Sequence, residues 1–229
     1  MPLEAARPPL AIPAVPPLPV PDDFAVRAAA IGVVLPADRA PRLGAYLALL
    51  IAMNEQVNLT RITEPGEAWR RHVLDALTLV PELSDVPAGA RLLDVGSGGG
   101  VPGIPLAIAR PDLRVDLLEA TGKKADFLRG AARALDLPID VHADRAEKLA
   151  TSELRGRFDV VTARAVAAID ALLGWTAPFA KEGGKLLFIK GERADEELAA
   201  ARGAMKRYRC THERTTVTPT GRVVVLRVG

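Results

Sequence analysis

Residues 91–103, which read RLLDVGSGGGVPG, limit what this chain can fold into more than any other stretch. A short apolar run carries one acid and then breaks into four glycines within five positions, followed by Pro102, Gly103 and an apolar segment at 104–109. A strand, a glycine-rich turn and a helix start, in that order, are typical of α/β sheets whose backbone N–H groups and helix N-terminus face a ligand. The stretch therefore predicts a ligand-binding turn after the first strand of such a sheet.

Apolar runs and helical periodicity alternate downstream of this turn. We expect strands at 91–95, 114–119, 139–142, 158–162 and 185–190. Helices are expected between them, at 103–109, 123–135, 146–152 and 168–180. A last helix near 194–206 precedes two strand-like runs at 208–217 and 222–228. This order predicts an α/β fold, with a doubly wound, mostly parallel sheet and an antiparallel C-terminal strand pair.

The residues ahead of the sheet divide into two parts. Residues 1–21 are rich in proline, which favours extended conformations and predicts a disordered arm without packed structure. Residues 22–85 have helical periodicity and predict a small helical cap. We expect its helices at about 24–33, 38–58 and 66–80. Residues 86–229 then form the ligand-binding sheet domain.

Composition excludes several classes of protein. With 30 basic and 28 acidic residues the net charge is only +2, so affinity for nucleic acid would need a local basic patch. The single cysteine, Cys210, excludes a disulfide framework and a cysteine-based metal site, so we predict no metal. No apolar run approaches the roughly 18 residues of a membrane span, and the proline-rich start does not resemble a signal peptide. We expect a cytoplasmic, monomeric protein without a membrane partner.

Two cofactor templates match the glycine turn. Gly98, Gly100 and Gly103 satisfy the dinucleotide pattern G-x-G-x-x-G, although four crowded glycines make such a match easy by chance. Read from Gly96, D-V-G-x-G-x-G resembles motif I of the class I S-adenosylmethionine (SAM)-dependent methyltransferases. Glu119 ends the next strand, about 20 residues on, where both cofactors need an acid for the ribose hydroxyls. The C-terminal strand pair favours the methyltransferase sheet, while a non-catalytic module that binds SAM or a dinucleotide stays an alternative.

The kind of methyl transfer is narrowed by missing motifs. Methylation of a pyrimidine C5 needs a cysteine nucleophile near the cofactor, and Cys210 lies in the C-terminal hairpin. Methylation of an exocyclic amine usually employs an Asp/Asn-Pro-Pro-aromatic motif after the fourth strand, where residues 162–168 read TARAVAA. The remaining acceptors are a purine ring nitrogen, an oxygen or a small molecule. Guanine N7 carries no proton, so positioning alone could suffice there.

Six motifs in order carry a more specific resemblance: NLTRI…RRHVLDAL (58–77), DVGSGGGVPGIPLAI (94–108), LLEATGKKADFL (117–128), RAE (145–147), TARA (162–165) and FIKG (188–191). Together they resemble the small-subunit (16S) ribosomal RNA guanine-N7 methyltransferase family, also called glucose-inhibited division protein B, over about residues 25–228. The resemblance implies a Rossmann-like class I methyltransferase fold, SAM as cofactor and 16S rRNA of the small ribosomal subunit as partner. A SAM-dependent methyltransferase of a small molecule stays the runner-up.

The resemblance also implies roles for individual residues. SAM would contact Asp94, Gly96, Gly98, Val101, Glu119, Ala120, Thr121, Ala146, Glu147 and Arg164. RNA would contact Asn58, Arg71, His72, Lys123, Lys124, Arg145 and Lys190. Arg164 and Lys190 are the predicted catalytic residues. Met53 and Ala76 depart from the family, which usually has an aromatic residue and a serine there, and His72 with Asp75 could equally be a structural pair on one helix face.

Overall fold

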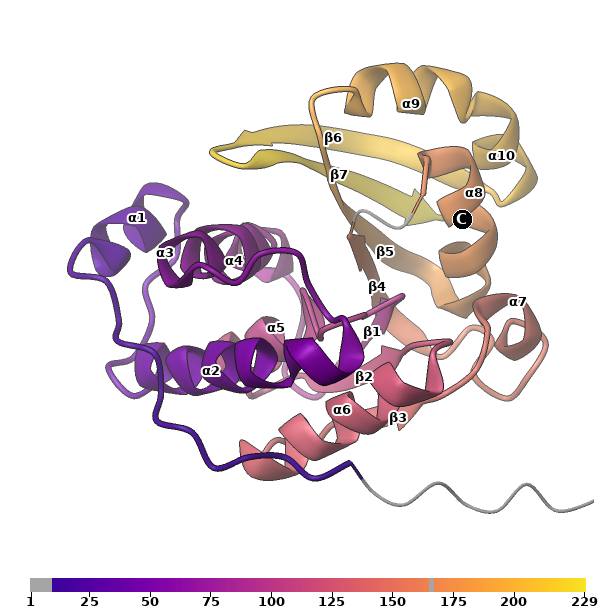
Figure 1. Cartoon of the computed structure of the whole chain (residues 1–229). Coiled ribbons are helices and arrows are strands. Elements are labelled where there is room, and N and C mark those ends of the chain that lie inside the picture. The colour runs from indigo at the N-terminus through magenta and orange to yellow at the C-terminus, as the bar shows by residue number, and fades with distance from the viewer. Residues whose placement is uncertain (1–9, 165–166) are drawn as a thin grey trace, which may run out of the picture.

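The structure is a computed structural model that describes residues 10–164 and 167–229. Its centre is a seven-stranded sheet with the order β3-β2-β1-β4-β5-β7-β6 (Figure 1). The strands are β1 (Arg91–Val95), β2 (Arg114–Leu118), β3 (Asp140–His142), β4 (Phe158–Arg164), β5 (Ala180–Lys190), β6 (Cys210–Thr218) and β7 (Gly221–Val228). The first five are parallel, whereas β7 runs antiparallel to both β5 and β6. The predicted doubly wound sheet with an antiparallel C-terminal pair is therefore confirmed.

Two hydrophobic cores cover the two faces of the sheet because successive strand side chains point to opposite sides. Leu92 belongs to the core shared with the cap, and Leu93 to the core on the other face. Helices α5 (Gly103–Ala109) and α6 (Gly122–Ala134) lie on the cap side. The other face holds α7 (Ala146–Leu149), α8 (Ile169–Thr176), η3 (Ala177–Phe179), α9 (Ala194–Ala200) and α10 (Arg202–Arg207). The helix predicted at 194–206 is thus two helices that meet at Ala201.

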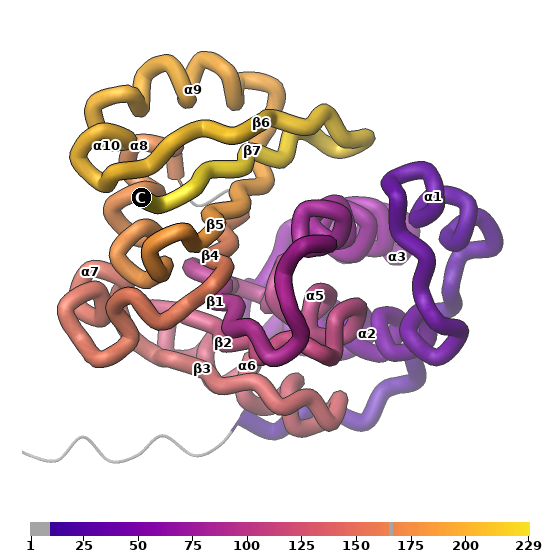
Figure 2. Tube along the Cα trace, turned by 180° about the vertical axis from the view of Figure 1, so that it is seen from behind, coloured from indigo at the N-terminus to yellow at the C-terminus, as the bar shows by residue number. Residues whose placement is uncertain are grey.

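The helical cap packs directly on the sheet. Its elements are α1 (Phe24–Ala30), α2 (Arg39–Val57), α3 (Pro65–Ala68), the π-helical η1 (Trp69–Leu74), α4 (Asp75–Leu77) and η2 (Pro81–Leu83). Leu50 of α2 and Leu77 of α4 are fully buried in the same core as Leu92 of β1. Figure 2 shows from behind how these helices flank the strands. Within the described residues, no helix is both long enough and apolar enough to span a bilayer.

Residues 10–21 correct one prediction. They run in extended form along α2 and α6, with the apolar side chains between the prolines partly buried against the core. Leu18 N donates to Gly44 O over 3.1 Å, and a side chain at Gly44 or Gly130 would collide with Leu18 or Ile12. The expectation of an arm without packed structure is wrong for this segment, because two glycines leave room for it. Residues 1–9 of the predicted arm lie outside the described residues.

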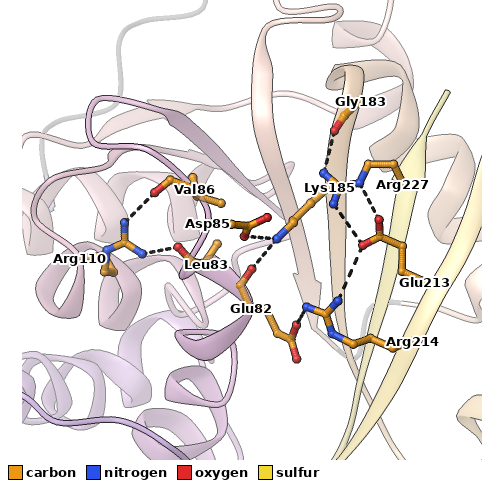
Figure 3. Close-up of polar contacts among 10 residues, drawn as sticks. All are labelled: Glu82, Leu83, Asp85, Val86, Arg110, Gly183, Lys185, Glu213, Arg214 and Arg227. Atoms are coloured by element: carbon orange, nitrogen blue, oxygen red, sulfur yellow. Dashed lines mark hydrogen bonds and ion pairs between the residues drawn. The ribbon is translucent and has the colours of Figure 1, made fainter.

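A polar network ties the end of the cap to the sheet (Figure 3). The buried ammonium of Lys185 on β5 donates to Glu82 O over 2.9 Å and pairs with the Asp85 carboxylate. The Glu82 carboxylate pairs with Arg214 of β6 and accepts from Thr216 Oγ1 over 3.1 Å. The network therefore holds η2 against β5 and β6.

Glu82→Ala is expected to lower the free energy of unfolding by about 1–3 kcal/mol, because it removes charge-assisted hydrogen bonds at a buried carboxylate. Glu213→Ala is the matched control, since its 2.8 Å pair with Arg227 lies between partly exposed side chains and should contribute less than about 1 kcal/mol. Urea unfolding of the full chain measures both. Equal losses would show that burial of Glu82 does not strengthen the contact.

Candidate functional site

The turn between β1 and α5 has the backbone that its glycines predict. Gly96, Gly98 and Gly100 have φ values of +71°, +56° and +96°, a region that strains other residues. The cap holds this turn in place, because Tyr46 of α2 donates its hydroxyl to Gly99 O over 2.8 Å. A Cβ at Gly99 would also lie 2.6 Å from Leu50 Cδ1. The glycine turn is therefore shaped by the cap as well as by its own sequence.

Asp94 lies behind the glycine turn. Its side chain is fully buried, with one carboxylate oxygen accepting from Gly103 N and the other from Thr162 Oγ1, each over 3.1 Å. Burial raises the pKa of this carboxyl to about 6 although these hydrogen bonds oppose the shift. Asp94 thus joins β1, the start of α5 and β4. We correct its predicted role from contact with the cofactor to support of the turn.

Glu119 joins the glycine turn to the end of β2. Its carboxylate accepts from Gly98 N over 2.9 Å and from Thr121 N over 2.7 Å, and the residue is only 7% exposed. A carboxylate has about four lone-pair sites, so two remain for further donors. Those sites suit the two hydroxyls of a ribose, as the sequence predicts.

A pocket of about 410 Å³ opens beside Glu119 at the carboxyl ends of the strands. Seven of the predicted cofactor residues line it: Gly96, Gly98, Glu119, Ala120, Ala146, Glu147 and Arg164. Val101 does not, because its side chain is buried in the core, and we correct its predicted contact to a packing role. Thr121 contributes its N–H to Glu119 from outside the lining. The lining also includes Trp175 of α8, for which the sequence predicts no role.

The donor set of this pocket fits SAM. The cations Lys124 and Arg145 in its lining suit a carboxylate, and Glu119 suits ribose hydroxyls. Trp175 and Leu118 in the lining offer apolar surface for an adenine. The volume lies within the roughly 300–1,000 Å³ of small-molecule sites.

A second pocket, of about 550 Å³, shares Arg164 with the first. Arg164 Nη1 donates to Arg71 O over 2.7 Å and lies 3.4 Å from Asp75 Oδ2. Asp75 is buried and also accepts from the Thr220 hydroxyl. The guanidinium is thereby held between the two pockets by Arg71 and Asp75 of the cap, and Thr220 of the β6–β7 turn in turn holds Asp75.

Lys190 also lines the second pocket but is already engaged. Its Nζ donates to Ala167 O over 2.6 Å and pairs with Glu197 over 2.7 Å, and the residue is 8% exposed. Glu197 accepts in addition from Ile169 N over 3.1 Å. Lys190 therefore joins the end of β5 to α8 and α9, and a ligand would meet an ammonium held in place.

The predicted RNA contacts fall into three groups. Arg71 and Lys190 line the second pocket, whereas Lys124 and Arg145 line the first. Three predicted residues lie outside both linings: Asn58, exposed at the end of α2, Lys123, exposed at the start of α6, and His72. The structure brings the four lining cations to one edge of the sheet.

His72 lies inside the cap. It is 3% exposed, and its Nε2 lies 2.9 Å from Thr60 Oγ1. RNA cannot reach the imidazole there, so the predicted contact is corrected to a packing role. Burial, and secondarily the charge of Arg164, lowers the pKa of His72 to about 4.

This low pKa predicts a loss of stability in acid. The unfolded chain takes up a proton near pH 6.5 that the folded protein accepts only near pH 4, so stability falls as the pH drops through that interval. Between pH 7 and pH 5 the contribution of His72 is about 2 kcal/mol. His72→Gln should therefore lose about 2 kcal/mol less than the parent over this range, measured by urea unfolding at both pH values. The exposed His212→Gln control should lose as much as the parent, and an equally acid-sensitive His72→Gln would contradict the assignment.

Comparison with known proteins identifies the family. The family model described as GidB, rRNA small subunit methyltransferase G, matches residues 39–223. "Ribosomal RNA small subunit methyltransferase G" of Sorangium cellulosum is 54% identical over 222 residues, which cover 96% of this chain and 93% of that protein. The protein of the same name from Mycolicibacterium smegmatis is 40% identical over 169 residues, 74% of this chain and 71% of the relative.

Solved structures agree on the fold. The O-methyltransferase from Bacillus cereus in complex with SAH has a TM-score of 0.56 at 16% identity, covering 90% of this chain and 97% of that one. A SAM-dependent methyltransferase from Aquifex aeolicus has a TM-score of 0.55 at 15% identity, covering 70% and 93%. The predicted Rossmann-like methyltransferase fold and the SAM cofactor are confirmed. The chain belongs to the rRNA small subunit methyltransferase G (GidB) family.

Proposed function

We propose that this protein transfers the methyl group of SAM to N7 of a guanine in the 16S rRNA of the small ribosomal subunit. Family membership supports the rRNA methyltransferase activity. The observation that carries the proposal is the meeting of two pockets at Arg164: one has the donors for SAM, and the other has the size and charges for a nucleotide. Transfer between two bound groups requires such an arrangement.

The first pocket would hold the cofactor through groups from several strand ends. The glycine turn at Gly96 and Gly98 would let the backbone come close to its methionine part, and the Glu119 carboxylate would face its ribose. Ala146 and Glu147 at the start of α7 would meet the adenine edge, and Trp175 lines the same pocket. When bound, SAM supplies an electrophilic methyl group on a positively charged sulfur.

The second pocket would hold the acceptor. Guanine N7 carries a lone pair and no proton, so the protein needs no general base and acts by positioning. Arg164, Lys190 and Arg71 offer cations to guanine O6 and to phosphate oxygens. Methyl transfer moves positive charge onto the guanine, and the exposed Glu192 carboxylate at this pocket can stabilise that charge. The same carboxylate can accept hydrogen bonds from guanine N1–H and N2–H, a pair of donors that adenine does not present together.

Oligomeric state, cellular location and domain organisation form a second part of the proposed function. We propose a monomer that works in the cytoplasm, with a packed segment at 10–21, a cap at 22–85 and a methyltransferase domain at 86–229. The shared core of cap and sheet supports a cap that moves with the domain as one body. Analytical ultracentrifugation of the full chain should give a single species near the 24.3 kDa of one chain, and a stable dimer would contradict the monomer.

The decisive assay incubates the full protein with methyl-labelled SAM and small ribosomal subunits that lack the modification. Label should appear in 16S rRNA as N7-methylguanosine after digestion to nucleosides. Affinity for the subunit should fall as salt rises, because phosphate contacts release counterions. Label at another atom, or no label in guanine, would exclude the proposed reaction, and a salt-independent substrate affinity would favour a small-molecule acceptor.

A further inference from the structure

A third pocket, of about 250 Å³, lies between the cap and the β6–β7 turn. Ile31 after α1, Leu74 of η1 and Pro219 of the turn form its apolar lining, and Arg27 and Arg70 line it from α1 and η1. Figures 1 and 2 show α1 and the tip of the β6–β7 hairpin on the same side of the molecule. Nothing in the proposed reaction uses this pocket.

The third pocket adjoins the proposed acceptor pocket. Thr220 lines both of them, and the neighbours Arg70 and Arg71 line one each. Arg71 Nη1 donates to Thr220 O over 3.2 Å, so this contact forms part of the partition between the two. A chain that leaves the acceptor pocket past Thr220 would enter the third pocket next.

The charges of the third pocket favour an anionic occupant. Its lining among the described residues includes two arginines and no acidic residue. Each arginine pairs with a carboxylate of its own helical segment, Arg27 with Asp23 over 2.7 Å and Arg70 with Glu67 over 2.8 Å. Such exposed pairs contribute little free energy, so the guanidinium groups can exchange them for phosphates.

The apolar lining suits the face of a base. Single-stranded RNA is commonly held with unstacked bases against apolar or guanidinium surfaces while cations bind its backbone. We propose that the third pocket binds the base of the nucleotide next to the methylated guanosine, with Arg27 and Arg70 on the adjoining phosphates. This inference rests on the proposed function, since it needs RNA in the acceptor pocket.

Two kinds of variant test the subsite in the full-length protein. Arg27→Ala/Arg70→Ala removes both cations, and Ala30→Trp fills the pocket from an exposed position at the end of α1. The matched controls lie on α6, on the far side of the cap from the hairpin (Figure 1). Arg129→Ala/Arg133→Ala is the control for the double arginine variant, because it also removes an i,i+3 ion pair and an arginine in the last turn of a helix. Ala134→Trp is the control for Ala30→Trp, because it also adds an indole at an exposed helix end.

Methyl transfer to unmodified small subunits is measured over a range of subunit and salt concentrations, with SAM affinity measured separately. The double arginine variant should raise KM for the subunit about tenfold and reduce the salt slope by about 1 per arginine. Ala30→Trp should raise KM similarly with the salt slope unchanged, because it removes no charge. SAM affinity and kcat should stay near the parent values in both variants.

The outcomes separate this inference from the proposed function. If the parent labels guanine N7 while both test variants match their α6 controls, the subsite is refuted and the methyl transfer stands. Loss of SAM affinity in either variant would also refute it, since the pocket would then act through the cofactor site. If the parent itself fails to label guanine, the proposed function falls and the subsite falls with it.

Discussion

Gly96→Asp is expected to abolish SAM binding. Gly96 lines the first pocket, with a φ of +71°. An aspartate would fill this close approach and set a second carboxylate beside Glu119, against the methionine carboxylate of the cofactor. We expect affinity to fall at least about 100-fold, equivalent to roughly 3 kcal/mol, by isothermal titration calorimetry.

Gly156→Asp is the control for this substitution. Gly156 has a φ of +63° in an exposed turn before β4, with no atom within 4 Å of an added Cβ, so the same backbone strain arises far from the pocket. Both variants should lose similar stability, about 1 kcal/mol, and only Gly96→Asp should lose SAM. Unchanged affinity in Gly96→Asp would refute the position of the cofactor in this pocket.

Arg164→Met is expected to reduce methyl transfer about 100-fold at saturating SAM and subunits, equivalent to roughly 3 kcal/mol. Among the described residues, Arg164 alone lines both the first and the second pocket. Methionine keeps an unbranched apolar side chain at this position but removes the positive charge. Arg164→Lys should recover only part of the rate, because lysine lacks the planar fork that holds two partners. Single-turnover transfer from labelled SAM measures the chemical step.

A structural role must be separated from a catalytic one, since Arg164 also neutralises the buried Asp75. Asp75→Asn removes that pair while it keeps the guanidinium, so it should retain far more activity than Arg164→Met at similar stability. Urea unfolding of each variant gives the stability. If Arg164→Met unfolds readily but its folded fraction transfers methyl groups at the parent rate, the residue is structural.

Most of the fold was predictable because its signals are local. The helix at 103–109 follows from one apolar run after a glycine turn, and the structure has α5 at those residues. Most other strand and helix boundaries agree within a few residues, since periodicity reports which side of each element is buried, but β5 begins at Ala180, five residues before the expected 185. The predictions that failed concern packing. Residues 10–21 are extended, as their prolines predict, but they pack against α2 and α6, where Gly44 and Gly130 leave room for them.

The candidate site was predictable only in part. Glu119 lines the pocket because it follows a parallel strand, and ligands of such sheets bind at the carboxyl ends of the strands. Trp175 was missed because nothing in a helical pattern distinguishes a core indole from one that lines a cavity. His72 and Asp94 were given contacts with ligands because their motifs carried the resemblance, yet both are buried among groups of the protein.

The sequence alone was enough to predict the order of strands and helices, the glycine turn, the position of Glu119 at the end of β2 and the family. Each of these depends on neighbouring residues or on a motif. The sequence alone did not determine which charged groups face a ligand. Asp94 is turned inward by Thr162, 68 positions later, and Arg164 is held between the two pockets by Arg71, 93 positions earlier. Such pairings arise only when the sheet and cap assemble, because burial makes each polar group take whichever partner the fold brings near.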